Sequence, residues 1–396
     1  MKRQRNESST PTDKRVVLAF LNAFTEGISG GDAWFIEVAK RLPEVEWIVV
    51  TSKLGRELCI RGGLNAEYLI SSDEESFGGV LKTYLRRTRV GLRLTRGVIA
   101  DVVLATSDAP PDVIPAIWYK IRSQKRHVEY IQKVYHIIPF RPSRIFAWLV
   151  QAGMLTFVSL SANSVATVSK KLKEQLRHRG MRESKIFVTK PGATLPDSFK
   201  NETDVAFQRT LSTYNALYVG RLNPTKGVLQ LPTIWSKVVT MSPQARLAIV
   251  GHGNDEMVRL IQTSIKDLKL GDSVSLLGHL PEEVVWELRR QVSIFVSPSH
   301  EEGFGMAILE AMAAGLPTIA WNLEIYRESF DQGILLISED NLEDFARTVV
   351  DLLSNDEWRS ALAVEARQCA TRFNWDATAR AEYATFFAPQ SQLSAD

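Results

Sequence analysis

The side chains best suited to chemistry in this sequence are two glutamates, Glu302 and Glu310, with seven residues between them. A glycine turn at residues 303–305 follows the first glutamate, and a helix is predicted over residues 306–314. The start of a helix presents free N–H groups and partial positive charge, which suit a phosphate. A carboxylate can accept hydrogen bonds from two hydroxyls. The spacing therefore predicts a site for a ligand with both phosphate and hydroxyl groups, such as a nucleotide sugar.

Predicted elements on either side would hold these glutamates in place. Residues 292–297 form an apolar run that is typical of a buried parallel strand. Gly315 and Pro317 end the helix that follows the turn. In open parallel sheets, ligands bind beyond the carboxyl ends of the strands, and this strand–turn–helix unit puts both glutamates at such an end.

Arg221 and Lys226 form a second candidate pair after another predicted strand, residues 216–219. An arginine can bind phosphate through two parallel hydrogen bonds, and a lysine adds a second positive charge. The alternative is a solvated basic loop, but the place of the pair after a sister strand favours a diphosphate site. No strong acidic metal-binding motif accompanies the pair. We therefore expect the two cations, and no metal, to neutralise a departing nucleoside diphosphate.

Several motifs in residues 218–317 resemble those of the retaining glycosyltransferases of family 4, whose fold is GT-B. One is the Glu-x7-Glu spacing with its internal Gly-Phe-Gly, followed by Ala-Met-Ala-Ala-Gly-Leu-Pro. The others are Gly-Arg-x4-Lys-Gly at residues 220–227, Gly-x-Gly at 251–253, Leu-Gly-His-Leu-Pro at 277–281 and Ser-Pro-Ser at 297–299. The resemblance is specific over this region and weaker but consistent in the N-terminal half.

The resemblance implies a role for each matching residue. Glu310 would hold the ribose hydroxyls and Glu302 would contact the transferred sugar, while Arg221 and Lys226 would act on the leaving diphosphate. The implied reaction retains the anomeric configuration by a front-face route, in which the leaving phosphate helps to deprotonate the acceptor. A covalent intermediate on Glu302 is the less favoured alternative. The remaining donor-site residues would be Gly251, Gly278, His279, Leu280, Gly303, Phe304, Gly305 and Met306.

Two features of the N-terminal half are further candidates. Residues 27–31 follow the first predicted strand but lack the glycine spacing of the dinucleotide fingerprint, which argues against an NAD enzyme. Gly30 and Gly31 resemble the family's N-domain loop that faces the diphosphate or acceptor, with a plain turn as the alternative. His136 follows a strand, like the histidine that many relatives place near the transferred sugar, with a structural role as the alternative.

Strand and helix signals alternate along both halves, which predicts an α/β chain with two doubly wound parallel sheets. Strands are predicted at residues 15–21, 47–51, 102–106, 128–135, 164–168, 186–189, 216–219, 245–250, 273–277, 292–297, 318–321 and 334–337. The expected parts are a disordered tail (1–14), an acceptor-side Rossmann-like domain (15–196), a linker (197–213), a nucleotide-sugar-binding Rossmann-like domain (214–371) and a terminal helix (372–390). The resemblance implies that this helix crosses back to the N-terminal domain and that the domains face a central cleft.

Size and composition limit the function classes. The chain has 396 residues, which is too many for one ordinary core and enough for two domains. Its net charge of +3 gives no argument for nucleic acid. With only Cys59 and Cys369, no disulfide framework is implied, and a reducing, cytoplasmic compartment is expected. The first 14 residues are polar and lack the apolar segment of a signal peptide.

One stretch without charged side chains, residues 145–169, raises the question of a membrane. Its uninterrupted apolar runs are well short of the ~20 residues that span a bilayer. We favour a buried helix followed by a strand at 164–168, and a membrane-seated helix is the alternative.

A stripe of basic residues is spaced four, three, four and three positions apart, which puts its members on one side of a helix. The stripe is Lys82, Arg86, Arg89, Arg93 and Arg96, and the adjoining apolar stripe is Leu81, Leu85 and Leu92. A basic amphipathic helix of this type suits an anionic membrane surface where an acceptor could be presented. The alternative is a helix packed by its leucines with a solvated basic face.

Together these observations predict a GT-B enzyme that moves a hexose of mannose or glucose type from a nucleoside diphosphate sugar. The expected acceptor is a glycan, a polysaccharide precursor or a lipid-linked sugar, and the expected location is cytoplasmic or peripheral on the inner face of the plasma membrane. The alternatives are another GT-B enzyme, such as a sugar-nucleotide epimerase or a phosphorylase, and a non-catalytic nucleotide-sugar-binding protein. Residues 321–327 replace the family's usual glycine-rich stretch, which leaves the donor sugar open.

Overall fold

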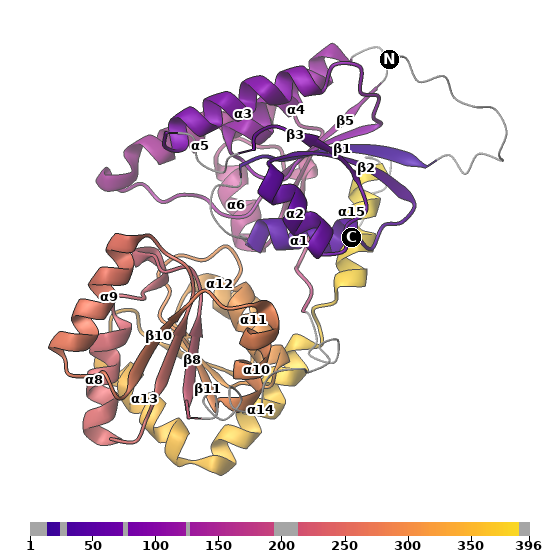
Figure 1. Ribbon diagram of the computed structural model, residues 1–396. Helices are drawn as coiled ribbons and strands as arrows, with labels where there is room; N and C mark the ends of the chain where they lie inside the picture. The colour runs from indigo at the N-terminus through magenta and orange to yellow at the C-terminus, as the bar shows by residue number, and fades with distance from the viewer. Residues whose placement is uncertain (1–13, 24–29, 74–77, 124–126, 194–212, 388–396) are drawn as a thin grey trace. The chain divides into compact units, whose positions relative to one another are not determined.

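The computed structural model describes residues 14–23, 30–73, 78–123, 127–193 and 213–387 (Figure 1). The chain divides into two compact units. Unit 1 comprises Met1–Thr167, Leu172–Thr189 and Asp376–Asp396, and unit 2 comprises Val168–Lys171 and Lys190–Trp375. The predicted tail and the predicted linker lie outside the described residues, apart from Lys14 and Thr213.

Unit 1 is built on a seven-stranded parallel sheet in the order β3-β2-β1-β4-β5-β6-β7. Its strands are β1 (Arg15–Leu21), β2 (Val45–Thr51), β3 (Glu67–Ile70), β4 (Val102–Ala105), β5 (Glu129–Val134), β6 (Ser164–Thr167) and β7 (Ile186–Val188). The central strands are short runs that are buried on both faces, as expected for a parallel sheet. The strand order reverses between β1 and β4, which is the switch point of this sheet.

The helices that connect these strands are α1 (Gly30–Ala39), α2 (Lys53–Arg61), α3 (Val80–Leu94), α4 (Pro110–Arg122), α5 (Ile145–Ser161) and α6 (Lys170–His178), with short 3-10 turns at Pro142–Arg144 and Glu183–Lys185. Pro110 and Pro111 begin α4, where their missing N–H groups cost nothing. α4 packs against both α3 and α5, so these three helices form one layer over the sheet (Figure 1).

The final helix, α15 (Trp375–Phe387), belongs to unit 1 from Asp376 onward. Its Glu382 forms a buried ion pair with Lys133 of β5. The same carboxylate accepts hydrogen bonds from Trp34 Nε1 (2.6 Å) and Thr189 Oγ1 (3.4 Å). Burial lowers the pKa of Lys133, and the negative charge of Glu382 opposes that shift. This cluster fixes α15 to the sheet of unit 1.

Unit 2 has a six-stranded parallel sheet in the order β10-β9-β8-β11-β12-β13, which reverses between β8 and β11. Its strands are β8 (Ala216–Val219), β9 (Leu247–Val250), β10 (Val274–Gly278), β11 (Ile294–Ser297), β12 (Thr318–Trp321) and β13 (Ile334–Ile337). Its helices are the 3-10 turn η5 (Pro224–Lys226), α8 (Leu231–Met241), α9 (Asp255–Asp267), α10 (Glu282–Gln291), α11 (Met306–Ala313), α12 (Glu324–Ser329), α13 (Leu342–Ser354) and α14 (Asp356–Ala370).

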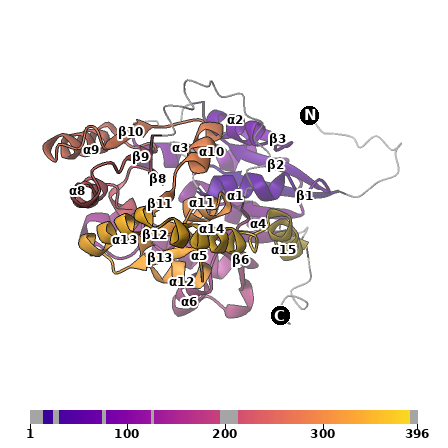
Figure 2. The same cartoon turned by 90° about the horizontal axis from the view of Figure 1, so that it is seen from below.

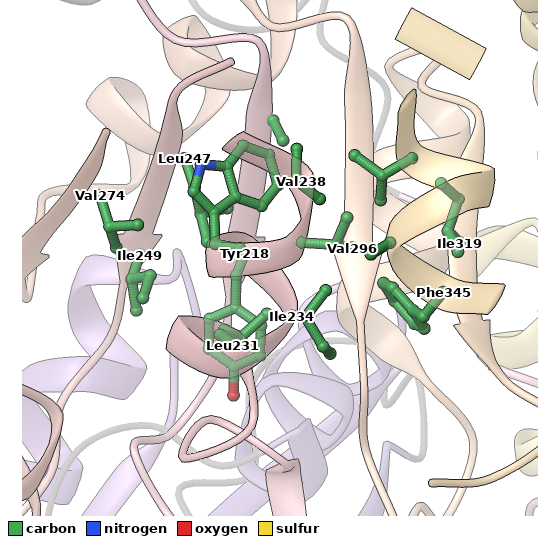
Figure 3. Packing of buried hydrophobic residues seen from close by; sticks show 14 of the residues in the cluster. Tyr218, Leu231, Ile234, Val238, Leu247, Ile249, Val274, Val296, Ile319 and Phe345 are labelled. Carbon is green, nitrogen blue, oxygen red and sulfur yellow. The ribbon is translucent and has the colours of Figure 1, made fainter. Parts of the chain in front are cut away.

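The main core of unit 2 lies between one face of this sheet and helices α8, α9 and α13 (Figure 3). Alternate strand residues point to this face, such as Tyr218 in β8, Ile249 in β9 and Val296 in β11. α13 packs beside α8 (Figure 2). The α8 residues in the core have helical spacing, and they are Leu231, Ile234, Trp235 and Val238.

The predicted fold class is confirmed, because both sheets are parallel and alternate with helices. Four predicted strands, at 15–21, 216–219, 318–321 and 334–337, agree residue for residue with the structure, and the others differ at their ends. The prediction omits β3. This edge strand has only four residues with partly exposed side chains, so its sequence shows neither an apolar run nor a clear alternation.

Residues 145–169 form a helix followed by a strand, as predicted, but the prediction that this helix is buried is wrong. Only Gln151, Leu155 and Val158 of α5 are buried. The opposite side of the helix is open, with Phe146 64% and Leu160 80% exposed. α5 carries apolar residues on all of its sides, so its composition does not show that unit 1 covers only one of them. Within the described ranges, no helix combines the length and apolar character needed to cross a bilayer.

Candidate functional site

β8 and β11 are neighbours in the sheet of unit 2, and their carboxyl ends lie where the strand order reverses. From β8 the chain continues to β9 on one side, and from β11 it continues to β12 on the other side, so the two connections run in opposite directions across the sheet. Such a divergence is where open parallel sheets bind their ligands. The loop after β8 carries Arg221 and Lys226, and the loop after β11 carries Glu302. The topology therefore brings together the candidate residues of two separate motifs.

The loop after β8 is a tight turn that lies against the loop after β11. Asn223 Oδ1 accepts a hydrogen bond from the Thr225 N–H (2.9 Å) and caps the 3-10 turn η5. Gly227 has a φ of +66°, and a Cβ at this position would lie 1.7 Å from the Pro298 carbonyl oxygen. Only glycine permits this approach, which places Lys226 beside the glutamate loop.

Lys226 and Glu302 form an ion pair between these loops, with 2.7 Å between Nζ and Oε1. The two side chains are only 18% and 16% exposed. Lys226 Nζ also donates a hydrogen bond to the Glu301 carbonyl oxygen at 3.3 Å. The predicted partner of the lysine is a diphosphate, and that of the glutamate is a sugar. Because the structure couples them, each residue modifies the charge that the other presents to a ligand.

Arg221 is exposed, and its backbone is held by a buried tyrosine. Its carbonyl oxygen accepts a hydrogen bond from the Tyr218 hydroxyl at 3.2 Å. Burial raises the pKa of Tyr218 well above its ordinary value, and the negative charge of Glu302 adds to this shift. The tyrosine is therefore neutral at all ordinary pH values and acts as a hydrogen-bond donor that fixes the start of the loop.

Glu310 lies in the second turn of α11 and forms an ion pair with Arg289 of α10. The Arg289 side chain is 3% exposed, and its guanidinium carbon lies 4.6 Å from the Trp286 ring centroid. Glu310 is 32% exposed, so Arg289 orients a carboxylate that is open to solvent. Arg289 is not among the predicted site residues. The sequence does hold a signal for such a role, because a charged residue follows the apolar Val285 and Leu288 on the buried side of α10.

Close backbone packing explains the glycines after β9. A Cβ at Gly251 would lie 1.8 Å from the Gly220 carbonyl oxygen, and a Cβ at Gly253 would lie 2.7 Å from that of Leu222. The Gly251 N–H donates to the Gly278 carbonyl oxygen at 2.8 Å. These contacts join the ends of β8, β9 and β10 along one edge of the sheet.

Gly278 is the last residue of β10, and His279 and Leu280 follow it, with the histidine exposed and the leucine half-buried. β10 is two strands away from β8, which corresponds to about 10 Å along the edge of the sheet. A ligand that contacts both positions must extend along the strand ends, as a nucleotide can.

The residue just before α11 is a glycine, which allows a backbone conformation that other residues rarely adopt. Gly305 has a φ of +105°, and a Cβ there would lie 2.9 Å from the Tyr326 ring. Gly303 and Met306 are half-buried on either side of it. The first N–H groups of this eight-residue helix have no carbonyl partners within the helix, so they are suited to an anion.

The side chain of Phe304 belongs to the core of unit 2, since it is only 5% exposed. Its ring centroid lies 5.6 Å from those of both Phe330 and Phe373. A ligand at this turn would meet the backbone of Phe304, and the role of Phe304 in the donor site stays a prediction. An aromatic residue inside a glycine turn gives no signal that separates these two roles.

Two predicted site residues of unit 1 begin α1. Gly30 is its first residue, and a Cβ at Gly31 would lie 2.7 Å from the Tyr135 ring. The Tyr135 hydroxyl donates to the Gly31 carbonyl oxygen at 3.3 Å. Close packing thus accounts for Gly31, while residues 27–29 of the predicted loop lie outside the described residues.

His136 is exposed after β5, and its segment is held by a glutamine that the sequence analysis did not assign a role. Gln151 Nε2 donates to the His136 carbonyl oxygen (3.0 Å) and to Asp108 (2.5 Å). Its Oε1 accepts a hydrogen bond from the Ile138 N–H at 2.7 Å. The available signal was a polar side chain among the apolar residues of α5.

A buried polar cluster lies at the switch point of unit 1. Asp112 accepts hydrogen bonds from the Asn22 N–H (2.7 Å) and the Ser107 hydroxyl (2.6 Å). Arg87 is fully buried and donates to the Asn22 carbonyl oxygen and to Ser72 Oγ, both at 3.1 Å. Burial raises the pKa of Asp112 to about 8, although its hydrogen bonds act in the opposite direction. The cluster fixes the end of β1.

The basic stripe is exposed throughout, but it is not entirely helical. α3 ends at Leu94, so Arg96 lies beyond it. Leu81 and Leu85 are 59% and 50% exposed, and therefore do not pack α3 onto the sheet as the alternative interpretation required. The buried residues of α3 are instead Thr83, Arg87 and Gly91.

Part of the chain is similar to known glycosyltransferases. Residues 200–369 match the family model described as Glycosyl transferases group 1. A D-inositol 3-phosphate glycosyltransferase of Corynebacterium jeikeium is 31% identical over 212 residues, which are 50% of this chain and 50% of that protein. An O-antigen chain mannosyltransferase B of Escherichia coli is 25% identical over 166 residues, which are 41% of this chain and 42% of that protein. The chain spans about half the length of the curated relatives it matches.

The structural similarity extends over nearly the whole chain. A crystal structure of Anabaena Alr3699/HepE in complex with UDP and glucose superposes with a TM-score of 0.76 and 17% sequence identity. The match covers 94% of this chain and 99% of that chain. At this identity the likeness shows the fold alone. Residues 200–369 therefore carry a glycosyl transferases group 1 region, in a chain with the two Rossmann-like domains of the GT-B fold.

Proposed function

We propose that this protein is a glycosyltransferase that moves a hexose, of mannose or glucose type, from a nucleoside diphosphate sugar. The observation that carries the proposal is the ion pair of Lys226 with Glu302 at the β8–β11 switch point, with Arg221 on the same loop as Lys226. This arrangement offers two cations to a diphosphate and a carboxylate to a sugar hydroxyl. The match of residues 200–369 to group 1 glycosyltransferases supports the same activity.

In the proposed donor complex, Arg221 and Lys226 bind the diphosphate and stabilise its charge as it leaves, without a metal. An ammonium group has three donors, and Lys226 directs two of them to Glu302 and to the Glu301 carbonyl oxygen. The third can reach a phosphate oxygen, so Lys226 would link the diphosphate to Glu302. Glu310, oriented by Arg289, would accept hydrogen bonds from the ribose hydroxyls.

Backbone groups would complete the donor site. Residues 278–280 would contact the nucleotide base, and the N–H groups of residues 303–306 would approach the phosphates at the start of α11. Gly251 would serve indirectly, by letting the β8 and β9 loops approach each other. In unit 1, we propose His136 for contact with the transferred sugar and the pair Gly30–Gly31 for contact with the diphosphate or the acceptor.

We propose that transfer retains the anomeric configuration by front-face displacement. In this route a phosphate oxygen of the leaving group takes the proton of the acceptor hydroxyl, so no carboxylate base is needed. A carboxylate engaged by an ammonium at 2.7 Å is a poor nucleophile, which disfavours a covalent intermediate on Glu302. Determining the anomeric configuration of the first-formed product by NMR tests this route, because an inverted product would contradict it.

The acceptor that we propose is a glycan, a polysaccharide precursor or a lipid-linked sugar, used at the inner face of the plasma membrane. The name of one relative, which mentions an O-antigen chain, supports this range. The exposed basic stripe on α3 supports a location beside anionic lipid.

The substitution Arg221→Ala tests the proposed activity. UDP- and GDP-hexoses are first screened by thermal shift, and consumption of the donor that binds is then measured with and without a chelator. Loss of a preorganised donor of this type should lower turnover by about 10²–10³-fold, with the melting temperature unchanged because Arg221 is exposed. The chelator should leave turnover unchanged.

A matched control for this experiment is Arg246→Ala, which removes an exposed arginine at the amino end of β9. That end is opposite to the proposed site, so this variant should turn over normally. Near-normal turnover in Arg221→Ala would contradict the proposal. If the wild type binds a nucleotide sugar but does not consume it, the protein is a non-catalytic nucleotide-sugar-binding protein.

A further inference from the structure

The surface of unit 1 includes an apolar helix face that the unit leaves uncovered. α5 has no charged side chain, and its buried residues, Gln151, Leu155 and Val158, lie on one side. The opposite side consists of Phe146, Leu149, Phe157 and Leu160, which are 64%, 54%, 56% and 80% exposed. A helix that is apolar all round is normally buried in a protein core or in lipid. Half of α5 therefore lacks the environment that its composition suits.

The neighbouring helix continues this apolar surface. α4 packs against α5, and its buried residues face β1, β4 and β5. Its outer side exposes Ile114, Trp118 and Ile121 at helical spacing, with exposed fractions of 38%, 47% and 52%. Before α5, Phe140 is 61% exposed and packs edge-on against Trp148, with 5.4 Å between ring centroids. Exposed apolar areas of this extent mark interaction sites.

The other neighbour of α4 supplies positive charge to the same outer surface. α3 packs against α4 with its buried side inward, so its exposed basic stripe faces outward. Residues 80–100 contain no aspartate or glutamate, and neither does α5. The only acid within α4 is Asp112, which is fully buried. The helices α3, α4 and α5 thus present apolar and cationic side chains together, with no exposed carboxylate of their own.

These properties decide between the candidate partners. A second copy of the chain would bring two identical cationic surfaces together, since a two-fold interface pairs like with like. An anionic bilayer offers acidic headgroups to the arginines and an apolar layer to α5. With 17 residues, α5 is about 25 Å long, shorter than the ~30 Å hydrocarbon core, and suits a helix that lies in the interface.

We propose that the outer surface of α3, α4 and α5 docks on an anionic lipid bilayer. The apolar side of α5, together with Trp118, enters the boundary between headgroups and acyl chains, while Arg89 and Arg93 contact the headgroups. The inference rests on the proposed function in one respect, because it narrows the acceptor to molecules held at a membrane. It predicts both a salt-sensitive and a salt-resistant contribution to binding.

The apolar contribution is tested by Phe146→Ser/Leu160→Ser in the full chain. Both side chains are largely exposed, so the fold should be unaffected, which thermal denaturation checks. The wild type should sediment with vesicles of phosphatidylglycerol and phosphatidylcholine, and the variant should bind them about tenfold more weakly or worse. The matched control is Leu260→Ser/Val364→Ser, which removes two exposed apolar side chains of unit 2, 47% and 48% exposed, and should bind like the wild type.

The electrostatic contribution is tested by Arg89→Glu/Arg93→Glu. Each arginine near an anionic surface contributes on the order of fivefold in binding, so reversing two of them should nearly abolish binding to these vesicles. Vesicles of phosphatidylcholine alone should bind the wild type weakly. Lys266→Glu/Lys269→Glu, on exposed residues in and just after α9, makes the same change in net charge and should have little effect.

Three outcomes would overturn the proposal. The wild type could stay in solution with anionic vesicles at low salt, or the Phe146→Ser/Leu160→Ser variant could bind them normally. The wild type could instead form a dimer that this variant dissociates, without binding vesicles, which would assign the surface to a second copy. Titration of the same preparations with UDP and GDP separates this proposal from the glycosyltransferase assignment. Vesicle binding without any nucleotide binding would sink the proposed function and leave the docking surface intact.

Discussion

Replacing Glu302 with glutamine should tighten the binding of the bare nucleoside diphosphate while it slows transfer. In the free protein, the Glu302 carboxylate lies 2.7 Å from the Lys226 ammonium. The proposed diphosphate uses the same ammonium, so its negative charge comes close to that of Glu302. Glutamine keeps an oxygen that accepts the hydrogen bond from Lys226 but removes the charge that repels the ligand.

The size of the effect follows from this geometry. A phosphate oxygen bound to Lys226 would lie about 5 Å from Glu302, where two like charges repel by roughly 3 kcal/mol at an effective dielectric constant of 20. Both side chains are partly exposed, at 18% and 16%, and the ammonium between them offsets some of the repulsion. A net gain of about 1–2 kcal/mol remains, which tightens Kd by about 5- to 30-fold.

Isothermal titration of wild type and variants with UDP and GDP measures this gain. Glu310→Gln should weaken binding, because its carboxylate is proposed to hold the ribose and is oriented by Arg289. Glu357→Gln, an exposed glutamate on α14, makes the same change in net charge and should leave Kd unchanged. If Glu302→Gln weakens the binding of the diphosphate as much as Glu310→Gln does, Glu302 itself contacts the diphosphate. The proposed division of roles between the two glutamates would then be wrong.

Two further predictions concern the stability of unit 1. The pKa of Asp112 is raised from 3.8 to about 8 by burial, so its stabilising contribution is complete below pH 3.8 and is lost as pH rises to about 8. Asp112→Asn imitates the protonated acid and should flatten the dependence of denaturant stability on pH between these values; an unchanged slope would show that other groups cause it. Glu382→Ala leaves Lys133 buried without its ion-pair partner and should cost unit 1 about 3–5 kcal/mol, a fall of roughly 10 °C in Tm by calorimetry. Lys133→Met/Glu382→Leu should recover most of this loss, and a Tm within about 1 °C of the wild type in Glu382→Ala would contradict the argument.

The sequence predicts the parts of the site that depend on short stretches of chain. Apolar runs identify β8 and β11, and the glycine turn before Met306 identifies the start of α11. The rule for ligands in parallel sheets then places Arg221 and Glu302 at strand ends. The ion pair of Glu302 with Lys226 cannot be predicted from these short stretches of sequence. It depends on the close approach of Gly227 to Pro298, which only the folded chain brings about.

Residues whose role depends on which side of an element is covered were also beyond the sequence analysis. Arg289 is a charged residue among the buried residues of α10, but its partner, Glu310, lies on another helix, so the ion pair appears only in the folded chain. α5 shows the reverse error, since its apolar composition suggested burial although one side of the helix is exposed. Composition gives the preference of a surface for water, and packing alone determines whether water is excluded from it.

The glycines and the charged residues of these motifs are required for different physical reasons. Gly227, Gly251 and Gly253 are required because a Cβ at each would lie 2.7 Å or less from a carbonyl oxygen of the neighbouring loop. These contacts exist without any ligand, so substitution of the glycines would distort the strand ends and would lower activity in any protein with this fold. Arg221 is exposed and supports no comparable contact through its side chain. Loss of function on its removal, with the fold intact, therefore reports on chemistry, whereas loss of function at the glycines reports on architecture.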